Sequence, residues 1–584
     1  MKDNRYTWAV EDIYSEIKAF DSDYDKVKSQ LDFSEFKGKL HLKQQFLACM
    51  QKQKDVLRVL EKLSLYAFLN HDKDTRDSFY DGLNTKITSL YSDYATLTAY
   101  IEPELTSLDE EILKSFIADE QFSEYDYMLK RILDEKAHVL SEKEETLLAN
   151  FSESFSAFRE IFSKIDNADL KFGNVMVDGK RHPLSHGTYG LIMHSDDRQL
   201  RKKAFKKYYK GYIDFINTIS SVYYANVKKN VSIAKARNYK SALSMALSGE
   251  DVEDVVYYNL LDSVNSALPL LHRYMTVKKK GLKLDEMHMY DVYVDQNNSS
   301  QLKYTYDQAY KVVVEGLSVL GEEYVSLLNK AHDERWIDVY ETEGKRSGAY
   351  SAGVFDTHPY VLLNYQQTTH DVFTIAHEMG HSIHTYFSNK TQPYFKADYK
   401  IFVAEVASTV NEVLLVKHLL KTAKGNCMKK YLLCYLMEMI RTTLFRQTQF
   451  SEFEEFSHSQ VEKGEPLTKD VMCEKYLSLN KKYYGEAVVS DEEIKYEWAR
   501  IPHFYRAFYV YKYSTGIISA LTIADRILTE GESAINDYFK FLSSGGSDSP
   551  VKLLKIAGVD LTDKNTFARA FKVFEDALEQ YEKL

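Results

Sequence analysis

The chain has 584 residues, of which 44% are hydrophobic and 28% charged. This length exceeds what one hydrophobic core usually supports, and the composition is that of a folded globular chain, so we expect at least two packed units and exclude a disordered chain. With 86 Asp and Glu against 75 Lys and Arg, the net charge of −11 argues against a nucleic-acid-binding role.

The cysteines and the first residues indicate the compartment. Four cysteines in so long a chain make no disulfide framework, which fits a reducing environment. The opening residues MKDNRYTW carry charges from position 2 onward and lack the apolar core of a signal peptide. No run of 18 uncharged apolar residues is present, so we expect no membrane span. We predict a cytoplasmic protein with neither a membrane nor a nucleic-acid partner, and the sequence leaves its oligomeric state open.

The N-terminal third of the chain is expected to be helical. Only 23 Gly and 8 Pro occur in the whole chain, which favours long helices. Residues 107–110 and 141–144, Ser-Leu-Asp-Glu and Ser-Glu-Lys-Glu, each have the form of a capping box. The pattern first changes at 171–183, where alternating apolar residues meet an Asp178-Gly179 turn and predict a β-hairpin. We place a domain boundary near residue 190.

The helical pattern of apolar residues is interrupted after residue 335. Residues 336–365 contain short runs that alternate between apolar and polar, together with three Gly, which predicts a small sheet. From Asp371 the helical pattern returns. In the last 20 residues, one helical face collects the apolar residues Phe567, Phe571, Phe574, Leu578 and Tyr581.

The strongest chemical signal is the sequence His377-Glu378-Met379-Gly380-His381, an H-E-x-x-H motif. On a helix, residues four apart lie on the same face, so the two imidazoles can bind one metal ion with Glu378 beside them. The shorter E-x-x-H motif of di-iron bundles also occurs, at 135–138 and at 455–458. The di-iron interpretation leaves His377 without a role, whereas in the zinc interpretation each residue of the motif has one. We therefore favour zinc.

A catalytic zinc site needs a third protein ligand. His384 lies one turn beyond His381, too far along a straight helix to share the ion, so we interpret it either as a packing residue or as one that contacts a metal ligand. In the next helical segment, Glu405 and Glu412 are seven residues apart and share a face. Two carboxylates on so apolar a segment are costly to bury unless they are paired or bind a metal. We predict Glu405 as the third ligand and Glu412 as the acceptor that orients a ligand histidine.

At this point the chain resembles a known family, the oligoendopeptidase F branch of the thimet-oligopeptidase-like zinc metallopeptidases. Four segments carry the resemblance: TIAHEMGHSIHTYF around the motif, AEVASTVNE at 404–412, GKRSGAYSAG at 344–353 and IPHFYRAFYVYKYSTG at 501–516. It implies a mainly α-helical, neurolysin-like zincin, in which two helix-rich domains enclose a deep channel and a small β-sheet lies beside the active-site helix. The expected domains are an N-terminal helical domain at 1–190, which includes the hairpin, and a catalytic metallopeptidase domain at 191–584.

The resemblance also implies roles for individual residues. One Zn²⁺ per chain is expected on His377, His381 and Glu405, with Glu378 as the general base. The segment at 501–516 resembles the stretch that contacts the substrate and the tetrahedral intermediate, and its candidate residues are His503, Tyr505, Tyr509 and Tyr511. Residues Ala349, Tyr350 and Ser351 resemble the edge strand that binds the substrate backbone.

The predicted function is zinc-dependent endopeptidase activity on internal bonds of short unstructured oligopeptides. Two alternatives remain open from the sequence. A metallocarboxypeptidase of related fold uses the same H-E-x-x-H motif with a distal Glu, and a helical peptide-binding protein could keep the fold without catalysis.

Overall fold

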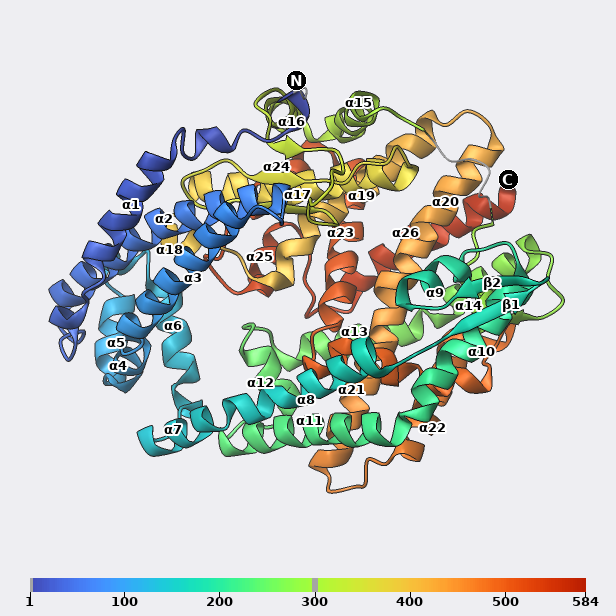
Figure 1. Ribbon diagram of the computed structural model, residues 1–584, viewed down its shortest axis with the longest axis horizontal. Coiled ribbons are helices and arrows are strands. Elements are labelled where there is room, and N and C mark those ends of the chain that lie inside the picture. Colours follow the sequence, from blue (N-terminus) through green and yellow to red (C-terminus); the bar gives the residue numbers. More distant parts are fainter. Residues whose placement is uncertain (1–3, 297–302) are drawn as a thin grey trace. The chain divides into compact units, whose positions relative to one another are not determined.

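A computed structural model describes residues 4–296 and 303–584 and consists mainly of α-helices with small β-sheets (Figure 1). The predicted mainly helical fold class is confirmed. The chain divides into two compact units, each assembled from three segments. Unit 1 contains Met1–Ala137, Gln301–Leu419 and Ile523–Val559, and unit 2 contains His138–Ser300, Leu420–Thr522 and Asp560–Leu584. Among the described residues, no helix is both long enough and apolar enough to cross a membrane.

Unit 1 contains a group of N-terminal helices and the helices of the predicted metal site. α2 runs for 31 residues without a Gly or Pro, as the scarcity of both residues predicts. The helices that lie wholly or mainly in this unit are α1 (Ile17–Gln30), α2 (Lys43–Lys73), α3 (Ser78–Thr98), α4 (Ile101–Ser107), α5 (Glu110–Ile117), α6 (Asp126–Glu135), α15 (Tyr306–Leu317), α16 (Glu322–Asp333), α17 (Thr369–Thr391), α18 (Tyr394–Ala397), α19 (Ile401–Thr422), α24 (Glu532–Leu542) and α25 (Pro550–Ile556).

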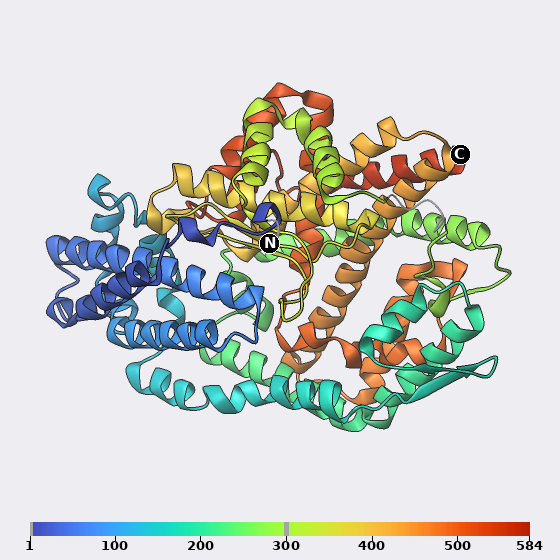
Figure 2. The same ribbon diagram turned by 45° about the horizontal axis from the view of Figure 1, so that its top comes forward.

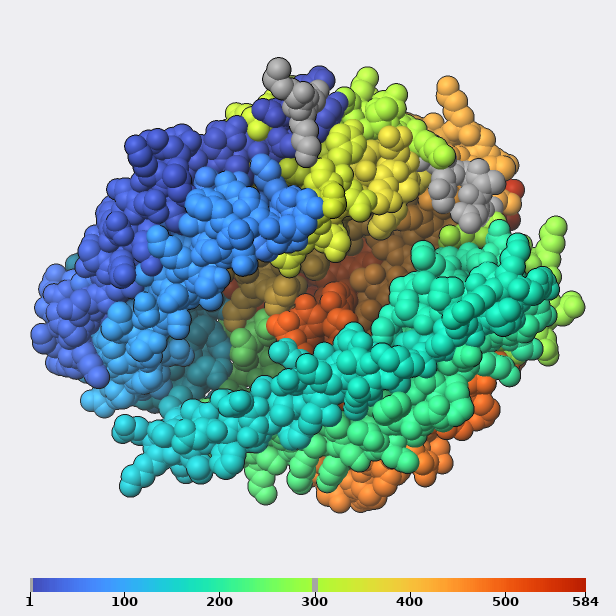
Figure 3. All heavy atoms as spheres, viewed as in Figure 1, coloured from blue at the N-terminus to red at the C-terminus, as the bar shows by residue number. Residues whose placement is uncertain are grey.

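A three-stranded sheet in unit 1 forms where the sequence predicts one. Its strands are β4 (Ile337–Asp338), β5 (Tyr350–Ala352) and β6 (Tyr360–Leu362), in the order β4-β6-β5. β4 is parallel to β6, and β5 is antiparallel to β6. Tyr360 and Leu362 are buried in the same hydrophobic core as residues of α2. The space-filling view shows the blue N-terminal helices directly against the yellow segment that carries this sheet (Figure 3).

Unit 2 is a second helical assembly with two two-stranded sheets. Its helices are α7 (Glu142–Asn150), α8 (Ser152–Lys164), α9 (His186–Met193), α10 (Arg198–Asp214), α11 (Ile216–Ala236), α12 (Ala242–Ser248), α13 (Asp254–Ser266), α14 (Leu268–Gly281), α20 (Asn426–Ile440), α21 (Arg446–Glu462), α22 (Lys469–Tyr484), α23 (Tyr511–Glu530, which ends in unit 1) and α26 (Asn565–Lys583). β3 (Met287–His288) pairs in parallel with β7 (Val488–Val489). The apolar face predicted for the last helix is buried, and α26 lies beside α20 in both views (Figures 1 and 2).

The hairpin predicted at 171–183 forms in unit 2. β1 (Asn174–Val177) pairs antiparallel with β2 (Lys180–Pro183). Asp178 and Gly179 both have positive φ, at 48° and 74°, which a tight two-residue turn requires and which glycine adopts without strain.

One of the two predicted capping boxes is wrong. Ser141 and Glu144 form the expected reciprocal pair at the start of α7. Ser107, in contrast, is the last residue of α4, and its hydroxyl donates to the carbonyl of Glu104 in the preceding turn. Because the chain before Ser107 is already helical, that side chain cannot also begin the next helix, and α5 starts after Asp109 instead.

Candidate metal centre and peptide-binding strand

Helix α17 carries the H-E-x-x-H motif and begins at a well-formed N-terminal cap. The hydroxyl of Thr368 accepts from the N–H of Asp371 at 3.2 Å, and the Asp371 carboxylate accepts from the N–H of Thr368 at 2.8 Å. This capping box satisfies two backbone donors at the start of the helix. His377 and His381 consequently lie in a regular part of α17, on the same face, as predicted.

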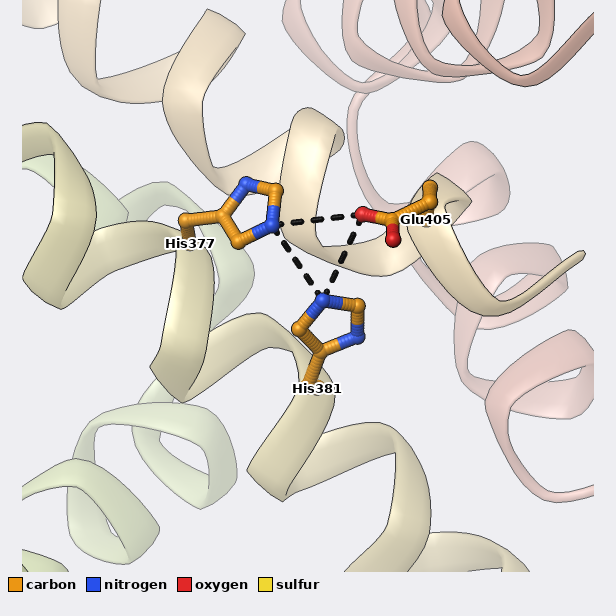
Figure 4. Close-up of side chains that lie close together, drawn as sticks. All are labelled: His377, His381 and Glu405. Carbon is orange, nitrogen blue, oxygen red and sulfur yellow. Dashed lines mark hydrogen bonds and ion pairs between the residues drawn. The ribbon is translucent and has the colours of Figure 1, made fainter. Parts of the chain in front are cut away.

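Three side-chain atoms from two helices converge on one point (Figure 4). Nε2 of His377 lies 3.2 Å from Nε2 of His381, and Oε2 of Glu405 on α19 lies 3.2 Å from the first and 3.4 Å from the second. Within the described part of the chain, these residues are the one group of three or more His, Cys, Asp or Glu side chains close enough to hold a metal ion. Neither of the other two E-x-x-H pairs belongs to such a group.

The spacing of these atoms fits zinc. Tetrahedral Zn²⁺ with ligands at about 2.0–2.1 Å separates those ligands by about 3.3–3.4 Å. The three distances of 3.2, 3.2 and 3.4 Å match that triangle. Two imidazoles and one carboxylate also make up the donor set of catalytic zinc sites, which leave a fourth position open. The side chains can therefore hold a zinc ion without a change in backbone.

Glu412 fixes the orientation of His377. Its Oε1 lies 2.6 Å from Nδ1 of His377. An ionised carboxylate only accepts hydrogen bonds, so Nδ1 is a donor, and loss of a proton from the ring leaves the lone pair on Nε2, the nitrogen that faces Glu405 and His381. The seven-residue spacing of the two carboxylates on α19 thus places Glu405 beside Nε2 of His377 and Glu412 beside Nδ1 of the same ring.

The charge at the centre favours a cation. Burial alone would lower the pKa of His377, but hydrogen bonds to Glu405 and Glu412 outweigh it and raise that pKa to about 10. Burial opposes the charge of Glu405, yet hydrogen bonds from the two histidines hold its pKa far below the usual value. The same two carboxylates that stabilise the protonated form of His377 also attract a divalent cation.

Glu378 is buried next to this centre, with 7% of its surface exposed. Burial raises the pKa of its carboxyl, the neighbouring histidines oppose the shift, and Glu405 and Glu412 add to it. A raised pKa suits a carboxylate that must accept a proton near neutral pH.

Two contacts that hold α17 against α19 were not predicted from the sequence. A Cβ on Gly380 would lie 2.5 Å from Cα of Ser408, so the helices cross where only glycine fits. Asn411 is fully buried; its amide donates to the carbonyl of Ala376 at 2.9 Å and accepts from the hydroxyl of Tyr324 at 2.8 Å. Asn411 thereby joins α16, α17 and α19. The signal for both residues is present in the sequence, as a glycine and an asparagine within apolar helical faces.

The predicted peptide-binding segment forms the edge of the sheet. Tyr350 and Ser351 belong to β5, whereas Ala349 immediately precedes it. β6 covers one edge of β5, and no strand of the described chain pairs with the other. Ser351 is hydrogen-bonded to Ser382 of α17 at 2.8 Å, and the hydroxyl of Tyr350 donates to the buried carboxylate of Asp72 at 2.9 Å. β5 is therefore fixed to α17 and to α2, and its second edge has no partner among the described strands.

Of the two interpretations of His384, the structure supports packing. It is 1% exposed, its ring lies flat against that of Tyr399 at 3.8 Å between centroids, and burial lowers its pKa to about 3. The ring is therefore neutral and does not join the centre.

The candidate residues of the segment at 501–516 fall into two classes, and all of them lie in unit 2. His503 is exposed and Tyr509 half-buried, with ring centroids 6.0 Å apart. Burial and the nearby Arg506 lower the pKa of His503, so it is neutral at pH 7. The other two are buried: Tyr505 stacks on Phe162 of α8, and Tyr511 packs against Tyr257 of α13, with burial raising both phenol pKa values.

Known proteins are similar to this chain over almost its whole length. Residues 191–573 match "Peptidase family M3", and residues 104–172 match "Oligopeptidase F". Oligopeptidase PepF of Bacillus subtilis is 42% identical over 582 residues, which cover 99% of this chain and 87% of that protein. Group B oligopeptidase PepB of Streptococcus agalactiae is 38% identical, over 100% of this chain and 99% of that protein.

Solved structures agree with the fold. A crystal structure from Chlamydophila abortus is 35% identical and superimposes with a TM-score of 0.95, over 100% of this chain and 98% of that one. Oligoendopeptidase-F from Enterococcus faecium is 36% identical, with a TM-score of 0.73 over 97% and 98% of the two chains. The two sequence matches lie on either side of the boundary predicted near residue 190, whereas the compact units are interleaved along the chain, so that boundary stays a prediction.

Proposed function

The chain belongs to peptidase family M3 and is a metalloendopeptidase, and on this premise we propose that it uses one Zn²⁺ per chain to hydrolyse internal bonds of short, unstructured oligopeptides. The observation that carries the proposal is the triangle of Nε2, Nε2 and Oε2 atoms on His377, His381 and Glu405. The names of the relatives, oligopeptidase and oligoendopeptidase F, support oligopeptides as the substrate class. The scarcity of cysteines supports a cytoplasmic location.

In the proposed site, His377, His381 and Glu405 hold the ion and Glu412 keeps His377 in the ligating tautomer. Bound Zn²⁺ supplies Lewis-acid chemistry, which polarises the scissile carbonyl and makes water more acidic. Because Nδ1 of His377 is committed to Glu412, ring rotation would break a 2.6 Å hydrogen bond. The donor geometry is therefore set before the metal binds.

Glu378 acts as the general base in this proposal. Its carboxylate takes a proton from the attacking water and later gives it to the nitrogen of the leaving amine. Its buried position keeps bulk water away from the carboxylate, and its raised pKa makes the first transfer, from the attacking water, easier.

The proposed substrate contacts fall to strand β5 in unit 1 and to the segment at 501–516 in unit 2. The free edge of β5 offers main-chain hydrogen bonds, which bind a peptide with little regard to its side chains. His503 and Tyr509 are the first candidates for donors to the oxyanion because their rings are accessible. Tyr505 and Tyr511 are second candidates because both are buried.

Mass-spectrometric mapping of cleavage sites over peptides of increasing length tests this function. We expect internal cuts in short peptides, loss of activity with a chelator and recovery with Zn²⁺. Glu378→Gln should retain zinc and lose activity by at least about 100-fold, as expected for a general base. Release of single C-terminal residues would favour a carboxypeptidase instead, and full activity of Glu378→Gln would exclude the proposed mechanism.

A further inference from the structure

A cavity of about 530 Å³ opens in unit 1 where strand β5 ends. Its wall includes Gly353, the residue directly after β5, and Thr385 of α17. Thr385 lies one turn beyond His381 on the same helical face, about 6 Å along the axis. A peptide paired with the free edge of β5 and held at the metal centre would therefore pass this cavity at one end.

The charged residues that line the cavity are both acidic. Glu61 of α2 is half-buried, Asp398 is at the exposed side, and the described residues of the lining include no Lys or Arg. Glu61 accepts a hydrogen bond from the hydroxyl of Tyr394. A phenol is a neutral donor and leaves the negative charge of this pair uncompensated.

Two cations close in sequence to lining residues, Arg58 and Lys396, are paired with other carboxylates. Arg58 binds Asp356 through its Nε at 2.8 Å, and Lys396 binds Asp126 at 2.7 Å. Burial raises the pKa of Glu61, the hydrogen bond from Tyr394 and the charge of Arg58 oppose that rise, and the nearby carboxylates of Asp398 and Asp356 add to it. A cation from outside the protein would relieve this desolvated negative charge.

The rest of the lining suits the apolar part of a long cationic side chain. Leu57, Phe355 and Phe395 contribute hydrocarbon surface around the two carboxylates. Lysine and arginine bury an aliphatic stem on such a surface while the charged end meets a carboxylate.

We propose that this cavity is a substrate subsite for a positively charged group, supplied either by a Lys or Arg side chain or by the free amino terminus of the peptide. The inference rests on the proposed peptidase function and adds charge selectivity to it. Main-chain pairing with β5 gives broad recognition, and the carboxylates of Glu61 and Asp398 add a preference at one distance from the scissile bond.

The test uses the zinc-loaded enzyme and one neutral fluorogenic peptide that it cleaves. A single Lys is moved along this peptide, with norleucine at the same position as the uncharged partner, and each peptide is made with a free and an acetylated amino terminus. The measured quantity is the ratio of kcat/KM for each charged peptide to that of its uncharged partner. We expect a ratio of about ten, typical of one charge-assisted hydrogen bond, with Lys at positions on one side of the cut only or with the free amino terminus.

Glu61→Gln and Asp398→Asn should each lower this ratio towards one, mainly through KM. Glu315→Gln, which changes an exposed carboxylate on α15, should keep the wild-type ratio. An effect of Lys that survives acetylation identifies a side chain as the ligand, and an effect lost on acetylation alone identifies the amino terminus. A wild-type enzyme that cuts peptides without charge preference would overturn this inference but not the proposed function. Variants whose ratio equals that of the wild type would do the same. A wild-type enzyme that cuts no peptide would contradict the proposed function and the inference with it.

Discussion

At the scale of single residues, the hydrogen bond between Glu412 and Nδ1 of His377 links two helices and decides which ring nitrogen is free to bind a metal. We expect Glu412→Ala to weaken zinc binding by about 10- to 100-fold, the usual effect of removing such a partner. Competition with a chromogenic chelator measures the affinity. Glu315→Ala, at an exposed position of α15, should bind zinc like the wild type. Equal zinc affinity in Glu412→Ala and the wild type would contradict the orienting role.

The tyrosines of the segment at 501–516 differ in accessibility, which leads to a second residue-scale prediction. Tyr509 is half-buried with its ring beside Arg506, whereas Tyr505 is packed on Phe162. If Tyr509 donates to the oxyanion, Tyr509→Phe should lower kcat by about 100-fold with little change in KM. Tyr505→Phe removes a buried hydroxyl and should leave kcat within about twofold. Steady-state kinetics of both variants decides, and the reverse order of effects would assign the donor to Tyr505.

At the scale of elements, the metal centre depends on how closely α17 and α19 cross. Gly380→Ala places a Cβ 2.5 Å from Cα of Ser408 and 2.7 Å from the carbonyl oxygen of Ala407, both backbone atoms that cannot turn aside. We expect the variant to lose about 1 to 3 kcal/mol of unfolding free energy and also zinc affinity, because Glu405 moves away with α19.

Gly82→Ala is the matched control for this crossing. Gly82 is also helical and in unit 1, but its added Cβ meets nothing within 4 Å. This variant should be stabilised by about 0.5 to 1 kcal/mol, because alanine favours the helix. Thermal unfolding with and without zinc compares the two variants. A Gly380→Ala protein as stable and as zinc-bound as Gly82→Ala would show that the helix crossing tolerates a methyl group.

Sequence spacing predicted the helices of the metal centre and the residues that share their faces. It did not predict features that depend on contacts between segments distant in sequence. The H-E-x-x-H spacing was sufficient to predict that His377 and His381 share a helical face, and the seven-residue spacing predicted the same for Glu405 and Glu412, because helical periodicity alone places the members of each pair. The role of Gly380 could not be predicted, since it depends on which turn of α19 lies opposite. The capping box at Ser107 failed for a similar reason, because the preceding helix already includes that residue.

At the scale of the whole molecule, each compact unit is assembled from three segments that are distant in sequence. The sequence predicted more than one packed unit from length alone, but not which segments combine. In unit 2, one such long-range contact joins Glu454 of α21 to the segment at 501–516. The carboxyl of Glu454 is fully buried and accepts from the N–H of Phe508 at 3.0 Å. Phe508 has φ of +52°, an unusual backbone conformation for a bulky residue, and this hydrogen bond helps to hold it.

Glu454 makes the stability of the molecule depend on pH. Burial raises its pKa to about 8, and the hydrogen bond from Phe508 only partly opposes the shift. In the unfolded chain a Glu has a pKa of about 4.3, so between about pH 4.3 and 8 the folded state holds a proton that the unfolded state has released. The unfolding free energy contributed by this group therefore falls as pH rises through that window.

Glu454→Gln removes the titration and keeps an oxygen that can accept from Phe508. We expect its unfolding free energy to exceed that of the wild type by an amount that is smallest near pH 5 and reaches a few kcal/mol, on the order of 1.4 per pH unit of the window, at pH 8. Unfolding of both proteins at several pH values measures this difference, in which the pH dependence of the metal centre cancels because both proteins share it. Glu315→Gln should show no such trend, since its carboxylate is exposed. A difference between Glu454→Gln and wild type that stays constant from pH 5 to 8 would mean that Glu454 is ionised in the folded protein, and its hydrogen bond to Phe508 would then hold the segment at 501–516 through a buried charge.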